Sequence, residues 1–459
     1  MASIDITQSG GAGGNGDLKL LGTAVMTSTL TQVADALNTP SVLRISTVAV
    51  TNYGAGGITS NTAFGATALT GANTGIGNSA FGNNALASNT TGSSNTALGS
   101  NSLSLVTTGS SNTALGTGTL NSNLIGNRNI AVGGDALLSN TADNNVAVGY
   151  EAAKFTTSGS VTAFGHQALR SNVTGTENTA VGYQALLNST AGSNTAVGYL
   201  AATGITTGTG NIALGGRALQ SATTASNNVA VGSSAGFRIT TGFNNTAIGN
   251  SSLNQVTTQS NNVAVGKSSL ENNTAANNTA VGYEAGFTNT TGTGLTAVGF
   301  QALRASTGNN NTALGYQAGL AVSGAGASNT LIGYQSGLAV TTGGSNTLIG
   351  DSAGKSITTG SNNVLVGNIS GITTMGSTTA VGQSIVASNN SNSIFGYQAS
   401  DGGFATSVIL GRGATATASN QFVVGSATYN AGTVVAGANV SSQYWNVKIN
   451  GTDYKILLA

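Results

Sequence analysis

The sequence predicts an all-β protein, a β-solenoid in which short coils of chain stack on one another. The first reason is a repeat: Asn, Thr or Val, Ala, an apolar residue and Gly recur in this order, as in NTAVG at 178–182 and 194–198. The second is the repeat length of 14–18 residues, which leaves no room for a helix. The third is the β-branched residue that usually precedes the alanine and favours strands.

The glycines that close the phrase give the number of coils. They follow one another at 16–18 residues as far as Gly367 and at 14 or 15 residues after it. A period held this closely is a far stronger signal than any single motif. It predicts about 23 coils, which end at glycines 65, 82, 99, 116, 133, 149, 165, 182, 198, 215, 232, 249, 266, 282, 299, 315, 333, 350, 367, 382, 396, 411 and 425.

We number the positions of each coil from this glycine, which is position 0. Side chains alternate along a strand, so positions −3 and −1 share one face and position −2 lies on the other. Position −1 is a large apolar residue, such as Val181 or Leu214. We therefore expect the face with −3 and −1 to fill the interior, and the alanine at −2 to lie at the surface as a tight contact.

The residues after the glycine predict a second short strand. Positions +3 and +4 are small or apolar, as in Ala185-Leu186 and Ala302-Leu303, and a turn cluster such as Thr-Thr-Gly at 206–208 follows. Each coil is thus expected to run strand, kink, second strand, turn. A thin coil of this kind leaves its alanine face uncovered, which favours association. Because a closed three-fold assembly would cover that face and stay soluble, we expect a homotrimer.

Composition excludes several functions. Charged residues make up only 5% of the 459 residues, 13 Lys+Arg against 12 Asp+Glu, with a net charge of +1. We therefore expect no nucleic-acid partner. The chain has no Cys and a single His, which removes disulfide frameworks, thiolate metal sites and cysteine nucleophiles. We expect no cofactor, no metal and no enzymatic activity.

The repeated phrase, N-[ST]-[VT]-A-[VIL]-G at 14–17 residue spacing, resembles the head repeat of trimeric autotransporter adhesins. The resemblance covers about residues 61–425 and implies a left-handed parallel β-roll assembled as a trimer. Similar repeats occur in fibres and tailspikes of tailed bacteriophages. The 14–15 residue steps after Gly367 match the adhesin spacing best, so the longer coils before it are expected to differ in their loops or strands.

Two locations are compatible with this resemblance. Residues 1–30 show no charged segment followed by an apolar core, and no heptad stalk or run of 18 apolar residues is visible. These features favour a virion protein made in the host cytoplasm, without membrane insertion. We expect a tail fibre that mediates adhesion to a host glycan or protein. The alternatives are a cell-surface trimeric adhesin, and a capsid or tail decoration fibre without a receptor.

Four regions follow from the repeat. Residues 1–60 lack it, include a predicted strand at 42–50, and are expected to attach the chain to tail or baseplate proteins and to cap the first coil. Residues 61–367 carry the 16–18 residue coils and residues 368–425 the shorter ones. Residues 426–459 predict a β-hairpin around Asn450-Gly451. This hairpin is expected to cap the solenoid or to form a receptor-binding tip through Tyr444, Trp445 and Tyr454.

Position +1 carries aromatic residues in two runs of consecutive coils. Stacked coils would place these rings in ladders, which could bind host glycans through Tyr150, Tyr183, Tyr199, Tyr283, Phe300, Tyr316 and Tyr334. The alternative, which we favour, is that the rings stack for stability alone. Position +2 holds Gln or Glu in several of the same coils and predicts a polar ladder beside the rings, at Glu151, Gln184, Glu284, Gln301, Gln317 and Gln335.

The remaining reactive side chains predict no catalytic site. His166 belongs to the first aromatic run, where a ring that replaces tyrosine is the better interpretation than an axial metal ligand in a trimer. A glycosidase would need two carboxylates about 5–10 Å apart. Glu151 and Glu284 lie eight repeats apart and cannot pair within one chain, and the other acidic residues are scattered (Asp135, Asp143, Glu177, Glu271, Asp351 and Asp401).

Overall fold

The computed structural model describes residues 60–71, 73–324, 326–371, 374–426 and 428, and the strands at 50–51, 444–449 and 452–457. These residues fall into two compact units that divide between Gly159 and Ser160. We call them unit 1 and unit 2 and describe each by itself. Residues 1–49 and 52–59, which include most of the predicted strand at 42–50 and the expected attachment region, lie outside the described residues.

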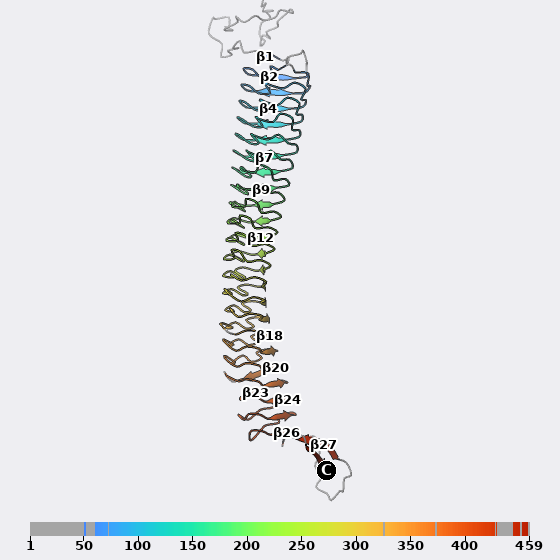
Figure 1. The fold of residues 1–459 in the computed structure, drawn as a ribbon, viewed down its shortest axis with the longest axis vertical. Coiled ribbons are helices and arrows are strands. Elements are labelled where there is room, and N and C mark those ends of the chain that lie inside the picture. Colours follow the sequence, from blue (N-terminus) through green and yellow to red (C-terminus); the bar gives the residue numbers. More distant parts are fainter. Residues whose placement is uncertain are drawn as a thin grey trace, which may run out of the picture. The chain divides into compact units, whose positions relative to one another are not determined.

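Both units are made of very short strands (Figure 1). In unit 1 these are β1 (Val50–Thr51), β2 (Thr62–Phe64), β3 (Ser79–Phe81), β4 (Thr96–Leu98), β5 (Thr113–Leu115), β6 (Ile130–Val132) and β7 (Val146–Val148). In unit 2 they are β8 (Thr162–Phe164), β9 (Thr179–Val181), β10 (Thr195–Val197), β11 (Ile212–Leu214), β12 (Val229–Val231), β13 (Thr246–Ile248), β14 (Val263–Val265), β15 (Thr279–Val281), β16 (Thr296–Val298), β17 (Thr312–Leu314), β18 (Thr330–Ile332), β19 (Thr347–Ile349), β20 (Val364–Val366), β21 (Ile369–Gly371), β22 (Thr379–Val381), β23 (Ile385–Ala387), β24 (Ser393–Phe395), β25 (Val408–Leu410), β26 (Phe422–Val424), β27 (Tyr444–Ile449) and β28 (Thr452–Leu457).

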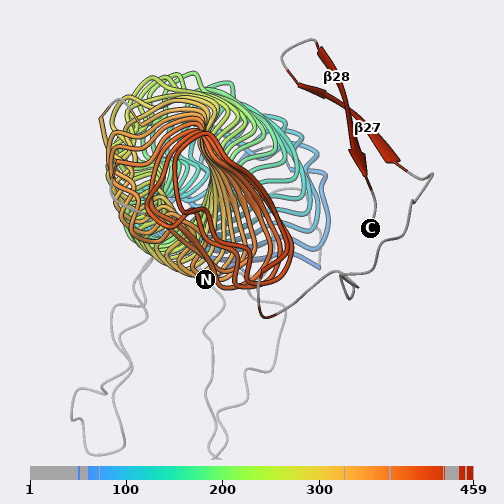
Figure 2. The same cartoon turned by 90° about the horizontal axis from the view of Figure 1, so that it is seen from below.

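The predicted solenoid is confirmed in each unit. Every predicted glycine is preceded by a strand at positions −3 to −1. Within each unit successive strands of this kind pair in parallel at the same positions, as Thr195, Ala196 and Val197 do with Ile212, Ala213 and Leu214. Unit 1 contains five complete turns and unit 2 sixteen, about 21 in all, with no helix among the described residues. Figure 2 looks along the coils and shows those of unit 2, from green to red, one behind another and each turned relative to the one before.

The predicted second strand is wrong for the long coils. From Gly65 to Gly350 the stretch after the glycine forms turns, because positions +2 and +4 adopt positive φ, as at Gln184 (52°) and Leu186 (50°). An extended strand cannot contain such residues. Second strands occur only where the repeat shortens: β21 pairs in parallel with β23, and bridges at Val386 and Ser400 continue that pairing. The expected difference between long and short coils is therefore present.

The predicted inside and outside of the strand are reversed. The alanine at −2 is fully buried in nearly every coil, as at Ala196 and Ala213, whereas positions −3 and −1 are exposed or half-buried. The interior is narrow, and alanine at −2 leaves space for the leucine at +4, which is also fully buried (Leu186 and Leu219). The expected alanine contact surface does not exist, so the alanine-based reason for a trimer is wrong.

Where the inward side chain at position −2 is larger than alanine, the inward side chain at position +4 is smaller than leucine. In three successive coils of unit 2 a leucine replaces the alanine at −2, at Leu331, Leu348 and Leu365. The coils that adjoin these leucines carry glycine at +4 in place of leucine. A Cβ on Gly337 would lie 2.9 Å from Leu331 Cδ2 and 3.1 Å from Leu348 Cδ1. The exchange conserves core volume, which packed interiors require.

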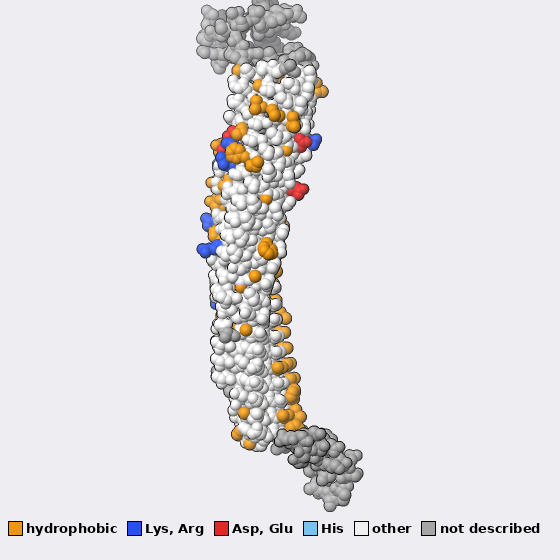
Figure 3. Space-filling model, viewed as in Figure 1, with side chains coloured by type: hydrophobic (Ala, Val, Ile, Leu, Met, Phe, Trp, Pro, Cys, Tyr) orange, Lys and Arg blue, Asp and Glu red, His pale blue; other side chains and the backbone are white. Residues whose placement is uncertain are grey.

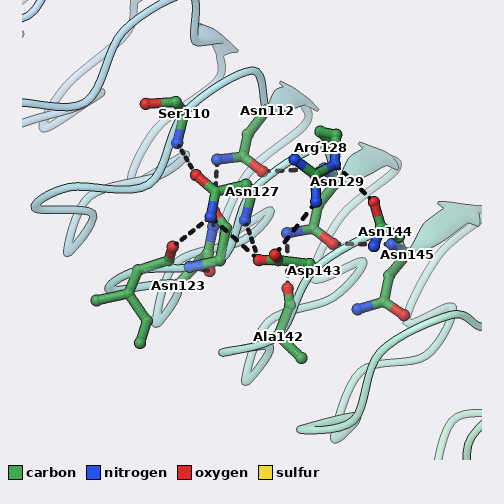
Figure 4. A network of polar contacts seen from close by, with 12 residues as sticks. Ser110, Asn112, Asn123, Asn127, Arg128, Asn129, Ala142, Asp143, Asn144 and Asn145 are labelled. Atoms are coloured by element: carbon green, nitrogen blue, oxygen red, sulfur yellow. Dashed lines mark hydrogen bonds and ion pairs between the residues drawn. The ribbon is translucent and has the colours of Figure 1, made fainter.

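A ladder of buried asparagines runs through the interior at position −4 (Figure 4). In unit 1 the Oδ1 of Asn112 accepts the backbone N–H of Asn129 at 3.0 Å, and the Oδ1 of Asn129 accepts that of Asn145 at 2.9 Å. Most of the side-chain nitrogens also donate to a turn carbonyl, as Asn129 does to Ala142 at 2.8 Å. These asparagines therefore join the start of their strands to the turns and to the next coil. Other residues replace asparagine at Val161 and Leu295 and, in the shorter coils, at Thr378, Ser407 and Gln421.

The closing glycines also form a column that no other residue could form. Gly182 has a φ of +132°, and a Cβ on it would lie 2.5 Å from the carbonyl oxygen of Gly198 in the next coil. Both the backbone conformation and the close approach of the coils thus require glycine.

Antiparallel strand pairs occur at the start of the repeat region and after it in the sequence. β1 pairs antiparallel with β2, the first strand of the repeat in unit 1. β27 and β28 pair antiparallel from Tyr444↔Leu457 to Ile449↔Thr452, as the predicted hairpin requires. Its turn at 450–451 lies outside the described residues, and its role as a cap or tip stays a prediction. Among the described residues no helix has the length and apolarity of a membrane span.

Candidate functional site

Stacked aromatic rings line unit 2 in two ladders at position +1. In the first ladder His166 stacks on Tyr183 at 5.3 Å between ring centroids, and Tyr183 on Tyr199 at 5.4 Å. The second ladder contains Tyr283, Phe300, Tyr316 and Tyr334, with centroids 5.1–5.3 Å apart and ring planes within 6–14° of parallel. The parallel register of the strands sets this spacing, since it repeats position +1 once per coil.

The rings are half exposed, but stacking covers most of their faces. Tyr183 and Tyr316, which lie inside their ladders, are each 43% exposed, whereas the last rings, Tyr199 and Tyr334, are 54% and 50% exposed. An inner ring thus presents mainly its edge and hydroxyl. A ring face, which is what packs against a sugar or another ring, is available only at a ladder end.

A polar ladder lies beside each aromatic ladder, as predicted. Gln184 Nε2 donates to Gln167 Oε1 at 2.8 Å next to the first ladder. Next to the second, Gln335 donates to Gln317, Gln317 to Gln301 and Gln301 to Glu284, each at 3.0 Å. The side-chain amides therefore form hydrogen bonds to one another from coil to coil along the surface. Each such residue adopts positive φ, which brings its side chain out beside the ring of position +1.

Glu284, at the start of the second polar ladder, also forms an ion pair with an arginine. Its Oε2 accepts from Arg304 Nε at 2.6 Å, and this hydrogen bond, with those from Gln301 and the Tyr283 hydroxyl, holds the pKa of Glu284 below its usual range. The hydrogen bond that Tyr283 donates to Glu284 raises the pKa of the tyrosine. Lys267 Nζ lies 6.0 Å from the centroid of the Tyr283 ring, at the start of the ladder. Glu284 thus receives hydrogen bonds both from the polar ladder and from Arg304.

The carboxylates predicted as scattered are used in local contacts. In unit 1 Lys154 Nζ lies 2.7 Å from Glu151 and 2.9 Å from Asp135, and these two bonds raise the pKa of Lys154. Asp143 pairs with Arg128 at 3.4 Å. In unit 2 the buried Asp401 accepts the backbone N–H groups of two turn residues, at 2.6 and 2.7 Å. These contacts give Glu151, Asp135, Asp143 and Asp401 a structural role.

The described residues contain no cluster of three or more His, Cys, Asp or Glu that could hold a metal ion. His166 lies in the first ladder as a stacked ring, in the position that tyrosine occupies in the coils of Tyr183 and Tyr199. Tyr150 belongs to unit 1 and is half exposed. The side chains of Tyr444, Trp445 and Tyr454 lie outside the described residues, so the expected tip is untested.

A second surface, which the sequence interpretation missed, lies on the strands themselves. Position −1 is apolar in every coil, and because the alanine points inward this side chain points outward (Figure 3). We call the row of position −1 side chains the apolar strip. Its most exposed members in unit 2 are Phe164, Val197, Leu214, Ile248, Val281, Leu314, Val381, Phe395 and Val424. The apolar residue at −1 was the available signal, but it was assigned to the interior.

No family model, curated protein or solved structure matches this chain.

Proposed function

We propose that the chain is a structural fibre of a phage virion, a tail fibre that holds an adhesive surface against a host cell. Each unit is a solenoid whose coils are joined by strand pairing and by the asparagine and glycine columns, which favours stiffness. The resemblance of its repeat to adhesin heads and phage fibres supports the adhesive role. The observation that carries the proposal is the pair of surfaces that run along the coils of unit 2: an apolar strip and aromatic ladders.

The apolar strip is the proposed contact between copies, in place of the alanine face. Monomeric proteins rarely expose a contiguous apolar row of this length. The strip repeats once per coil, so identical chains in the same register bring like positions together along the whole contact. Three copies around one axis close the assembly, whereas an open arrangement would form filaments.

Sparse charge supports the same assembly. At position −1 of the described coils no charged side chain occurs. Like charges at corresponding positions of identical chains would repel one another, and their absence from the strip removes that cost. The aromatic ladders, at position +1, are then the surface left for a host glycan, and many weak contacts repeated on three chains add as avidity.

Localisation tests the proposal directly. An antibody against unit 2 is expected to label the tails of purified virions in electron micrographs. The purified chain is expected to compete with virions for adsorption to host cells. Label on the outer surface of cells would favour the cell-surface adhesin, and label on capsids without competition would favour the decoration fibre. Either result would contradict the tail-fibre proposal.

A further inference from the structure

The first aromatic ladder ends at a glycine. The ring of Tyr199 is the last in its stack, and the corresponding positions of the next two coils are Gly216 and Ser233. Two strand spacings, about 9.6 Å, separate the coil of Tyr199 from that of Ser233. Along the stacking direction, a space the thickness of one aromatic ring is therefore left next to Tyr199, where Gly216 has no side chain.

Two glycines at position +1 can be compared to see which side of a ring is open. A Cβ on Gly134 would lie 3.5 Å from Tyr150 Cδ2, because the tyrosine of the following coil leans over that glycine. A Cβ on Gly216 would meet only the backbone oxygen of Tyr199, at 4.0 Å. Tyr199, by contrast, lies in the coil before that of Gly216, so its ring leans away from Gly216. Its ring face toward Gly216 is uncovered, in agreement with its 54% exposure.

Arg217 is the residue at position +2 beside this space. At the second ladder the side chains at +2 lie in a row beside the rings, where Gln301 donates to Glu284 of the preceding coil at 3.0 Å. Arg217 has a φ of 62° and Glu284 a φ of 51°, so their side chains leave the coil in the same direction. Arg217 is exposed, and none of the ion pairs in the described coils includes it. A group in the place of the missing ring would therefore meet a guanidinium.

We propose that this space binds one pyranose ring that carries a carboxylate, such as a uronic acid residue of a surface polysaccharide. The C–H face of the sugar packs on Tyr199. Its carboxylate pairs with Arg217, whose planar donors match two carboxylate oxygens. The inference rests on the proposed function, because it names the glycan class for an adhesive ladder. An aromatic side chain of another protein could also stack on the Tyr199 ring, but it carries no anion to pair with Arg217. The carboxylated sugar is therefore the better match.

The test uses the full chain with two probes, methyl β-D-glucuronide and methyl β-D-glucoside, titrated by saturation-transfer NMR. We expect the glucuronide to bind, and the glucoside to bind about tenfold more weakly because it lacks the charge-assisted hydrogen bonds. Arg217→Gln should remove this preference. Gly216→Tyr should abolish binding of both probes by filling the space with the residue that other coils carry there, so the variant keeps the fold.

Gly134→Tyr is the matched control, since it adds the same ring at position +1 of unit 1 and leaves Tyr199 unchanged. It should bind the glucuronide as the parent chain does. Glucuronide binding that survives Gly216→Tyr, or no binding of either probe to the parent chain, would overturn this inference. So would equal binding of both probes, which would leave Arg217 without a role. If the parent chain still competes with virions for host cells in any of these cases, the proposed adhesive function stands and only the site is wrong.

Discussion

The side-chain oxygen of Asn228 accepts two hydrogen bonds from Asn245, one from its backbone nitrogen at 2.9 Å and one from its side-chain nitrogen at 3.1 Å. The side-chain nitrogen of Asn228 donates to the turn carbonyl of Gly242 at 2.9 Å. All of these groups are buried, so each bond replaces water that cannot enter. The bonds from the backbone nitrogen and to the turn carbonyl repeat in most coils, and they tie strand, turn and neighbouring coil together.

Asn228→Ala should therefore destabilise unit 2. The change leaves the backbone N–H of Asn245 and the carbonyl of Gly242 without these partners, and we expect a loss of about 2–4 kcal/mol because each unsatisfied buried group costs about 1–3 kcal/mol. Thermal and denaturant unfolding measure it. Thr224→Ala, at an exposed turn of the same coil, should change stability by less than about 0.5 kcal/mol. Equal effects of the two changes would contradict the structural role of the ladder.

Gly182→Ala should be at least as harmful. Its positive φ costs about 1–3 kcal/mol for any other residue, and the added Cβ would clash with the backbone of Gly198. The matched control is Gly216→Ala in the same unit, where the Cβ enters open space and no positive φ is involved. We expect a fall in melting temperature only for Gly182→Ala. A similar fall for both glycines would show that the close approach of the coils is not as described.

Tyr316→Ala should reduce stability without affecting sugar binding. The ring stacks on both Phe300 and Tyr334, and each stack contributes about 0.5–1.5 kcal/mol, so we expect a loss of about 1–3 kcal/mol. Tyr316→Phe keeps the stacks and should be nearly neutral. Because both faces of this ring are covered, neither change should weaken glucuronide binding. A loss of binding in Tyr316→Phe would show instead that the hydroxyls of the ladder contact the ligand.

Acid should weaken unit 2 through Glu284. The pKa of this carboxyl is lower in the folded chain than in the unfolded chain, chiefly because of Arg304. Its contribution is therefore complete above the unfolded pKa of about 4.3 and is lost as the pH falls through the lower, folded pKa. Melting temperatures measured from pH 7 downward should fall more steeply for the parent chain than for Glu284→Gln. Glu177→Gln, which removes a carboxylate from a different coil, serves as the control, and identical curves for the parent chain and Glu284→Gln would contradict the prediction.

The sequence was sufficient to predict the solenoid and the position of nearly every strand. The repeat places glycine, where only glycine fits, at the end of each strand. The apolar residues at +4, such as Leu186 and Leu219, were assigned to a second strand, whereas the structure places them in the core. The two aromatic ladders also followed from the period alone. These features depend on spacing, which the sequence displays directly.

The orientation of the strand could not be deduced from hydrophobicity. A large apolar residue at −1 favours an interior position, but here the narrow coil admits only alanine beside leucine. The asparagine at −4 was the missed signal, because it shares the parity of the alanine at −2 and both point inward. Nothing in the sequence indicated the positive φ at non-glycine residues such as Gln184 either. Because of these φ angles the chain forms turns where a second strand was expected.

A charge on the apolar strip should separate copies without unfolding them. Leu314 is 50% exposed in the single chain, so Leu314→Arg creates no buried charge there, but in a trimer the arginines would meet apolar neighbours. We expect weaker association with an unchanged circular dichroism spectrum. Thr207→Arg, at an exposed turn, should associate as the parent chain does. Loss of association in Thr207→Arg as well would place the contact elsewhere.

The native mass of the full chain tests the assembly most directly. Each chain has a mass of 44.6 kDa, so three copies (3 × 44.6 kDa) would give about 134 kDa by native mass spectrometry or light scattering. We predict that mass for the parent chain and a shift toward 44.6 kDa for Leu314→Arg. A parent chain that stays at 44.6 kDa at micromolar concentration would contradict the trimeric fibre and leave the apolar strip without its proposed partner.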